Sequence, residues 1–283
     1  MKQKKIKLTG KIGFEQFYSD IYGLRWEKIK DAFFNENQST EYYIPGAKKS
    51  YFLDSASVFA ALCLPLKDAK KILDLCAAPG GKTLVLASRM SQDSMLFSNE
   101  RSAQRKARLV NVVQTCLPPK LSERVKISCS DGATWCTRQI ECFDRILLDA
   151  PCSSERHVLS DEKYLNEWSP ARIKTVTIQQ WSLLSSAYRL LQPNGIMIYS
   201  TCAICPCEND DMMQKLILKF NKDGNNFEFL LPQFDFAEIS DFCKILLPSY
   251  EKTKNGFQIF PDVQNGAGPI YFSIIKKLKS IKK

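Results

Sequence analysis

Histidine is almost missing from this sequence of 283 residues, which contains His157 alone. Three cysteines, Cys202, Cys205 and Cys207, lie close together, but no second Cys-x-x-Cys pair accompanies them. A structural zinc ion needs a full tetrahedral set of sulfur or nitrogen ligands. We therefore expect no metal site.

Long apolar runs are also absent. The longest, about Val58 to Leu66, contains Pro65, and it is far shorter than the roughly 20 residues of a membrane-spanning helix. The first ten residues are rich in lysine but lack the apolar core and cleavage site of a secretory signal. We expect no membrane partner, a cytoplasmic location with an organellar matrix as the alternative, and eleven reduced cysteines.

Acidic residues are outnumbered by basic ones, at 30 to 40, which gives a formal net charge of +10 and a pI near 9.0. A basic protein favours polyanionic partners, because phosphate contacts release counterions. Basic residues dominate from Arg101 to Lys126, and the segment from Ala267 to Lys283 has five lysines and no acid. A solvated basic surface explains either segment equally well. The charge therefore indicates nucleic acid without identifying it.

Short apolar runs alternate with longer helical segments from Lys71 onward, which is typical of a parallel sheet covered on both faces. We predict an α/β fold with a doubly wound, mostly parallel sheet. The predicted strands are Ile72–Cys76, Met95–Asn99, Val125–Cys129, Phe143–Asp149 and Gly195–Thr201. The predicted helices are Thr83–Met90, Ser102–Gln114 and Arg172–Leu191, the last ended by the stop signal Pro193, Asn194 and Gly195.

Both ends of the chain differ from this alternation. Two strand-like runs, Gly256–Pro261 and Ile270–Ile275, flank a turn-rich stretch that contains Asn265, and they predict a terminal antiparallel hairpin. The segment Phe14–Asn35 has an amphipathic helical pattern whose main expected role is packing. We therefore divide the chain into an N-terminal helical extension, residues 1–54, and one large domain, residues 55–283.

The segment Ile72–Thr83, ILDLCAAPGGKT, joins the first predicted strand to the first predicted helix through Pro79, Gly80 and Gly81. Glycines at the carboxyl end of a parallel strand let a ligand approach the backbone closely. The loop lacks the first glycine of a G-x-x-x-x-G-K-[ST] phosphate loop and the G-x-G-x-x-G of dinucleotide binders. It therefore predicts a cofactor loop of another kind.

Three acids follow the next predicted strands: Glu100, Asp131 and Asp149. An acid after the second strand is well placed to accept hydrogen bonds from ribose hydroxyls, so Glu100 is the ribose candidate. Any one such acid is more often a loop residue or a helix cap. The occurrence of three along one sheet edge favours the cofactor interpretation.

Cysteines also follow two predicted neighbouring strands, Cys152 after Asp149 and Cys202 after Thr201. We expect both thiols to project into one cleft beside the cofactor loop. Such a thiol suits one chemistry well, because C5 of cytosine is a poor nucleophile until a thiolate adds to C6. Addition there makes C5 an enamine carbon that can attack an electrophilic methyl group.

The motifs DLCAAPGGKT, DAPCSS and YSTCAICPCEND closely resemble those of the RsmB/NOP (Sun) family of RNA 5-methylcytosine methyltransferases. The resemblance runs from about Ser55 to Ile275. It implies a class I methyltransferase (Rossmann-like) fold, with Cys202 as the nucleophile and Cys152 assisting product release. It also implies an S-adenosylmethionine site formed by Cys76, Ala77, Ala78, Pro79, Gly80, Gly81, Lys82, Glu100, Asp131 and Asp149, with Arg105 where some members carry a cofactor-side arginine.

Two segments, CSSERH from Cys152 to His157 and GAGPIYF from Gly266 to Phe272, look closest to the compact ribosomal RNA methyltransferases of mitochondria. The resemblance therefore implies ribosomal RNA as substrate, with transfer RNA as the nearby alternative. Ser154 and Ala203 depart from the common family pattern of glycine and serine. Because both lie where the target base would sit, substrate preference does not follow from the resemblance.

Two other functions stay open: a methyltransferase acting on another nucleophile, and a non-catalytic RNA-binding assembly factor that retains the fold. A recruiting protein and the oligomeric state also stay open. For the preferred function we expect a single-stranded or extruded cytidine, because a stacked helix hides C6 from a thiolate. Asp149 would then contact N3 or the exocyclic amino group of the base.

Overall fold

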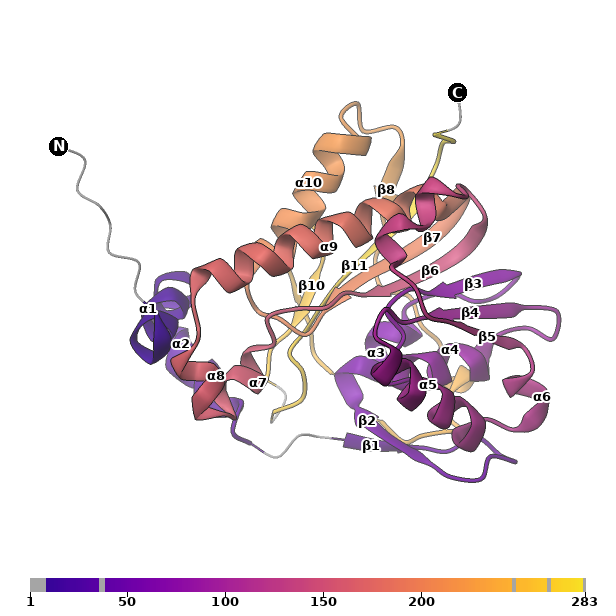
Figure 1. Cartoon of the computed structure of the whole chain (residues 1–283), viewed down its shortest axis with the longest axis horizontal. Helices are drawn as coiled ribbons and strands as arrows, with labels where there is room; N and C mark the ends of the chain where they lie inside the picture. The colour runs from indigo at the N-terminus through magenta and orange to yellow at the C-terminus, as the bar shows by residue number, and fades with distance from the viewer. Residues whose placement is uncertain (1–8, 36–38, 246–247, 264–265, 282–283) are drawn as a thin grey trace.

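The computed structural model of the chain describes residues 9–35, 39–245, 248–263 and 266–281. In this part, one large sheet has the strand order β5-β4-β3-β6-β7-β11-β10-β9, and β8 pairs with β11 (Figure 1). A small separate sheet pairs β1 (Ser39–Tyr42) with β2 (Tyr51–Asp54). The strands of the large sheet are β3 (Lys71–Asp74), β4 (Met95–Asn99), β5 (Val125–Ser128), β6 (Phe143–Asp149), β7 (Leu191–Thr201), β8 (Phe227–Phe229), β9 (Glu251–Lys252), β10 (Phe257–Ile259) and β11 (Ile270–Lys277).

The adjacent strands β5, β4, β3, β6 and β7 are parallel to one another. The β11 strand lies antiparallel beside β7, and β10 pairs antiparallel with β11. Crossover helices α4 (Gly81–Arg89), α5 (Ala103–Cys116) and α9 (Pro170–Leu190) connect the parallel strands. The predicted doubly wound, mostly parallel α/β fold with a terminal antiparallel hairpin is therefore confirmed. Residues 264–265 and 282–283, at the predicted hairpin turn and the end of the basic segment, lie outside the described residues.

Apolar side chains cover both faces of the large sheet. Helices α3 (Ser55–Leu62), α4 and α5 lie on one side, and α9 and α10 (Asp210–Phe220) lie on the other (Figure 1). Leu84 and Val112 belong to the first buried cluster, and Leu184 and Met212 to the second. Among the described helices, none is long and apolar enough to cross a membrane.

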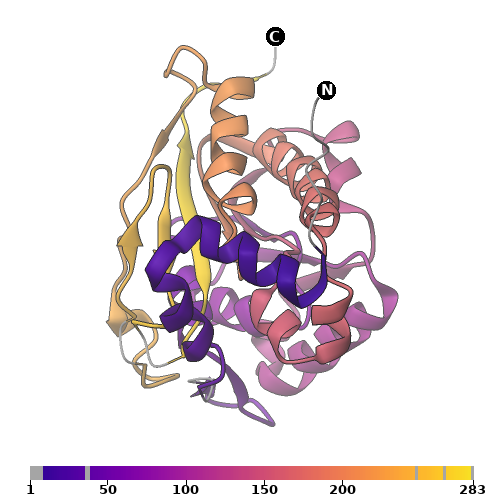
Figure 2. The same ribbon diagram turned by 90° about the vertical axis from the view of Figure 1, so that its left-hand side faces the viewer.

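The N-terminal segment is not the single helix that its pattern predicts. It forms α1 (Gly10–Tyr22), a 3-10 turn η1 (Gly23–Arg25) and α2 (Trp26–Ala32). The break follows from Gly23, whose φ of 54° is incompatible with a continuing right-handed helix. Figure 2 shows these helices in front of the yellow strands and beside α7 (Glu155–Leu159) and α8 (Glu162–Asn166).

The predicted stop signal does follow the end of α9, but its residues belong to the next strand. Helix α9 ends at Leu190, and β7 begins at once, so Pro193, Asn194 and Gly195 lie inside the strand. The pairing of β7 with β6 shifts register there, between Phe143 and Arg145. Pairing with β11 begins only at Ile196, so Pro193, which has no N–H, leaves no hydrogen bond of that ladder unmade. The glycine and proline therefore produce an irregular strand rather than a loop.

Several short elements have no counterpart among the predicted ones. Asp54 ends β2 and caps α3, because its side chain accepts hydrogen bonds from the N–H groups of Ala56 and Ser57 at 2.8 and 3.4 Å. The predicted boundary between residues 54 and 55 falls at this junction, and the division into two parts there stays a prediction. The remaining short elements are α6 (Pro119–Ser122), η2 (Gly132–Thr137), η3 (Pro206–Glu208) and η4 (Phe236–Glu238).

Candidate active site

Cys152 and Cys202 lie together just beyond the carboxyl ends of β6 and β7, as predicted. Because these strands are parallel neighbours with Asp149 opposite Ser200, the loops that follow them leave the sheet together. The sulfur atoms of Cys152 and Cys202 are 2.7 Å apart, and both are free thiols. The hydrogen bond to Cys202, together with burial, raises the pKa of the Cys152 thiol. Either sulfur can donate in this contact, and the raised pKa of Cys152 favours Cys152 as the donor.

A charged pair lies beside the thiols. Lys82 contacts Asp149, with 2.7 Å between Nζ and Oδ2, and Ser200 donates its hydroxyl to Oδ1 at 2.9 Å. Burial lowers the pKa of Lys82, but Asp149 and then Cys202 raise it, so that it lies above its ordinary value. Lys82 thus supplies a positive charge that interacts with both Asp149 and the Cys202 sulfur. The sequence predicts Lys82 only as part of the cofactor loop and does not predict its interaction with Cys202.

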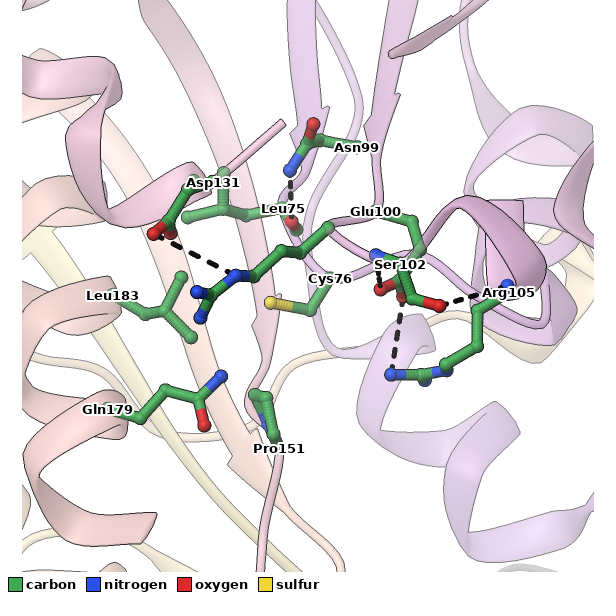
Figure 3. Close-up of a pocket in the computed structure, with 12 residues that line it drawn as sticks. Leu75, Cys76, Asn99, Glu100, Ser102, Arg105, Asp131, Pro151, Gln179 and Leu183 are labelled. Carbon is green, nitrogen blue, oxygen red and sulfur yellow. Dashed lines mark hydrogen bonds and ion pairs between the residues drawn. The ribbon is translucent and has the colours of Figure 1, made fainter. Parts of the chain in front are cut away.

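A cavity of about 380 Å³ opens beside these loops (Figure 3). Leu75, Pro151 and Leu183 give the cavity an apolar lining. The carboxylates of Glu100 and Asp131, which follow β4 and β5, also line it. A volume of this size is typical of a small-molecule site. The full lining is Leu75, Cys76, Asn99, Glu100, Arg101, Ser102, Arg105, Asp131, Gly132, Pro151, Gln179 and Leu183.

Glu100 is fixed at the end of β4. It is only 4% exposed, and the Ser102 N–H donates to Oε1 at 2.9 Å. Arg105 reaches Oε2 at 3.3 Å through Nη1 and donates from Nη2 to the carbonyl of Ala78 at 2.6 Å. Figure 3 shows Arg105 on the outer side of Glu100. Arg105 therefore ties the glycine-containing loop to the acid that follows the next strand.

Asp131 borders the same cavity from the loop after β5. Its Oδ1 accepts the Ala133 N–H at 3.1 Å and so caps η2, while Oδ2 lies 3.9 Å from Nε of Arg101. Gly132 follows, and a Cβ there would meet Cδ1 of Leu75 at 2.7 Å. The close approach explains the glycine, because any larger residue would displace an apolar wall of the cavity.

The glycine-containing loop itself faces a second, smaller cavity of about 180 Å³. Asp74 lines it; Oδ2 accepts the hydroxyl of Thr83 at 2.7 Å, but the buried Oδ1 has no hydrogen-bond partner among the described residues. Burial raises the pKa of Asp74 to about 7. The lining is Tyr51, Phe52, Leu53, Ser57, Asp74, Cys76, Ala77, Ala78, Pro79, Gly81, Lys82 and Asp149.

The structure therefore divides the predicted cofactor residues between two adjoining cavities, and Cys76 lines both. Glu100, Arg105 and Asp131 border the larger cavity, whereas most of the loop and Asp149 border the smaller one. Gly80 lines neither. Its φ is 124°, and a Cβ there would lie 2.9 Å from Cγ1 of Val112 in α5. Gly80 thus lets the loop pack on α5, which is a structural role.

Glycines after β3, an acid after β4 and an antiparallel β11 beside β7 define a class I methyltransferase fold. The family model described as 16S rRNA methyltransferase RsmB/F matches residues 61–265, which is more than half of the chain. The chain belongs to this family.

Curated relatives act on two kinds of RNA. The chain is 31% identical over 242 residues to the mitochondrial tRNA (cytosine(34)-C(5))-methyltransferase of Mus musculus, covering 83% of this chain and 66% of that protein. It is 29% identical over 239 residues to the 5-cytosine rRNA methyltransferase NSUN4 of Xenopus laevis, covering 83% and 58%. It is 34% identical over 234 residues to ribosomal RNA small subunit methyltransferase F of Vibrio vulnificus, covering 82% and 46%. The chain thus spans less than two thirds of the length of these relatives.

A crystal structure of a methyltransferase homolog protein from Pyrococcus horikoshii has the same fold. The TM-score is 0.70 at 21% identity, and the alignment covers 94% of each chain. S-adenosylmethionine is the cofactor of the family. The site residues fit it chemically: carboxylates suit ribose hydroxyls, the apolar walls of the larger cavity suit a purine ring, and the partnerless oxygen of Asp74 suits an ammonium group.

Proposed function

We propose that this protein is an S-adenosylmethionine-dependent RNA (cytosine-5)-methyltransferase that uses Cys202 as a covalent nucleophile. The observation that carries the proposal is the pair of free thiols, 2.7 Å apart, beside a cavity whose polar groups suit the cofactor. A single reactive cysteine would fit many reactions. Two thiols side by side, with a lysine next to them, suit a reaction in which one sulfur bonds to the substrate and later leaves.

We assign the cofactor contacts as follows. Glu100 accepts hydrogen bonds from the ribose, as an acid after the second strand does in related folds. Asp131 borders the same cavity, and the loop from Cys76 to Lys82 approaches the cofactor through its backbone. When bound, the cofactor supplies an electrophilic methyl group. Arg105 holds Glu100 and the Ala78 carbonyl together and so shapes the site indirectly.

The reaction begins when the sulfur of Cys202 adds as a thiolate to C6 of an extruded cytidine. Asp149, held by Lys82 and Ser200, accepts a hydrogen bond from the exocyclic amino group of the base, or from N3 when that atom carries a proton. The C5 carbon takes the methyl group and then loses its proton to solvent. The electron pair of the C5–H bond restores the C5–C6 double bond and expels Cys202 as a thiolate, which accepts a hydrogen bond from Cys152.

We propose ribosomal RNA as the substrate and transfer RNA as the alternative. The segment CSSERH supports the first, and the name of the mouse mitochondrial relative supports the second. The test is to map 5-methylcytosine by bisulfite sequencing and mass spectrometry in both RNAs, from cells with and without the gene. Loss of one methylated cytosine, restored by the wild-type gene, identifies substrate and reaction together. No change in either RNA would contradict the proposal and favour a non-catalytic assembly factor.

Glu100→Gln is expected to weaken cofactor binding. The amide keeps the size of the side chain but loses the negative charge and one acceptor oxygen. A hydrogen bond to a charged group contributes about 1.5–3 kcal/mol, so the Kd for S-adenosylmethionine should rise about tenfold or more in isothermal titration calorimetry. The control is Glu228→Gln, an exposed glutamate on β8, which should leave the Kd unchanged. An unchanged Kd for Glu100→Gln would remove Glu100 from the cofactor site.

A further inference from the structure

A buried carboxylate, Glu155, joins the loops that carry the two cysteines. Its side chain has no exposed surface. Ser153, directly after Cys152, donates its hydroxyl to Oε1 at 2.9 Å. The backbone N–H of Ile204, two residues after Cys202, donates to Oε2 at 3.2 Å. One carboxylate therefore holds together the segments that follow the two thiols.

Helix α1 supplies two further hydrogen bonds to the same place. The hydroxyl of Tyr18 donates to Oε1 of Glu155 at 2.5 Å, and the hydroxyl of Tyr22 donates to the carbonyl of Ile204. The two tyrosines are four residues apart, so they lie on one face of the helix. Ile204 is thereby held at its N–H by Glu155 and at its carbonyl by Tyr22.

Aromatic packing sets the position of α1. Tyr18 stacks on Trp26 of α2 with 5.0 Å between ring centroids, and Phe14 meets Trp168 edge-on at 5.5 Å. Trp168 lies between α8 and α9, so these contacts anchor the N-terminal helices to the part of the chain that follows the Cys152 loop (Figure 2). The two hydroxyl groups are thus presented by a packed cluster rather than by a loose helix.

Packing alone does not explain the polar groups. Phenylalanine at both tyrosine positions would keep the ring contacts and avoid the cost of burying hydroxyls. Burial raises the pKa of Glu155, while the hydrogen bonds from Tyr18, Ser153 and Ile204 oppose that rise. Well-packed apolar groups are often as stable as a buried charge with its partners. Stability alone therefore does not account for the arrangement, which holds the two cysteine loops in one geometry.

We propose that α1 is a positioning element of the active site, which sets the distance between the two thiols through Glu155 and Ile204. This inference rests on the proposed covalent mechanism, because the spacing of the thiols matters only if both act on one base. Tyr18, Tyr22 and Glu155 contact no reacting atom, so they are positioning residues. The N-terminal segment then has a role in the reaction beyond packing.

The test is the double variant Tyr18→Phe, Tyr22→Phe in the full chain. Single-turnover methyl transfer at saturating RNA and S-adenosylmethionine should slow about tenfold, since small misplacements of reacting groups are costly. The KM for RNA and the Kd for the cofactor should stay unchanged. The matched control is Tyr42→Phe, which removes the hydroxyl of another buried tyrosine, on β1, whose partner is Oγ of Ser88 at 2.6 Å. Its transfer rate should equal that of the wild type.

Glu155→Gln provides an independent variant of the same size. Its amide nitrogen cannot accept a hydrogen bond, so either the N–H of Ile204 or the hydroxyls of Tyr18 and Ser153 lose their acceptor. We expect slowed transfer with intact cofactor binding here too. A wild-type transfer rate in the tyrosine double variant would overturn the inference, and so would a parallel loss of cofactor affinity, which indicates a merely structural role. Methyl transfer by Cys202→Ala would instead overturn the proposed function, whatever the tyrosine variants do.

Discussion

Cys202→Ala is expected to lower methyl transfer to RNA by at least about 10⁴-fold, the order of loss seen when a covalent nucleophile is removed. Without the sulfur, nothing adds to C6, and C5 stays too weak a nucleophile to take the methyl group. Cys152 does not substitute, because its burial, which persists when the Cys202 sulfur is removed, raises the pKa of its thiol. The assay is transfer of radiolabelled methyl from S-adenosylmethionine to transcribed ribosomal or transfer RNA.

The matched control is Cys243→Ala, another partly buried free cysteine, which packs at the edge of the apolar cluster on the α3 side of the sheet. Its activity should equal that of the wild type. Cys202→Ala should also keep its affinity for S-adenosylmethionine in calorimetry, since Cys202 lines neither cavity. An active Cys202→Ala enzyme would overturn the assignment of the nucleophile.

The sequence predicts the meeting of the two cysteines because the relevant geometry is local to neighbouring strands. Within Phe143–Asp149, the residues from Ile146 to Leu148 form a continuous apolar run, as expected of a strand buried on both faces. Once it pairs with the next strand in parallel, Asp149 lies opposite Ser200, and the residues that follow, Cys152 and Cys202, share one edge of the sheet. Glu100 and Asp131 follow from the same rule, because parallel strands end together.

Contacts across the fold could not be predicted in this way. Lys82 lies in a recognisable loop, but its approach to Cys202 depends on the direction of α4 after Gly81. The partners of Glu155 come from residues as far as 137 positions away in the chain, and no periodic pattern records such a contact. The break at Gly23 was missed because a glycine within an amphipathic pattern is compatible with a helix until its φ is known.

Cys152→Ala is expected to trap a covalent complex between the protein and its RNA. In the wild type, the Cys152 thiol lies 2.7 Å from the sulfur that must leave C6 and carries the proton for a hydrogen bond to it. A hydrogen bond to a charged group contributes about 1.5–3 kcal/mol, so its loss should slow expulsion of Cys202 roughly 10- to 100-fold. Addition and methyl transfer come before that step and continue, and the adduct therefore accumulates.

The adduct is measured as an RNA-dependent band of lower mobility in denaturing gels, and as a peptide containing Cys202 with added nucleotide mass after digestion. Cys152→Ala combined with Cys202→Ala must give no band, because the bond forms at Cys202. If Cys152→Ala turns over normally and leaves no adduct, Cys152 has no role in release. If it accumulates an adduct that lacks the new methyl group, Cys152 acts before methyl transfer, and the order of steps proposed above is wrong. Only an adduct that carries the new methyl group agrees with a Cys152 thiol that assists departure of the Cys202 sulfur from C6.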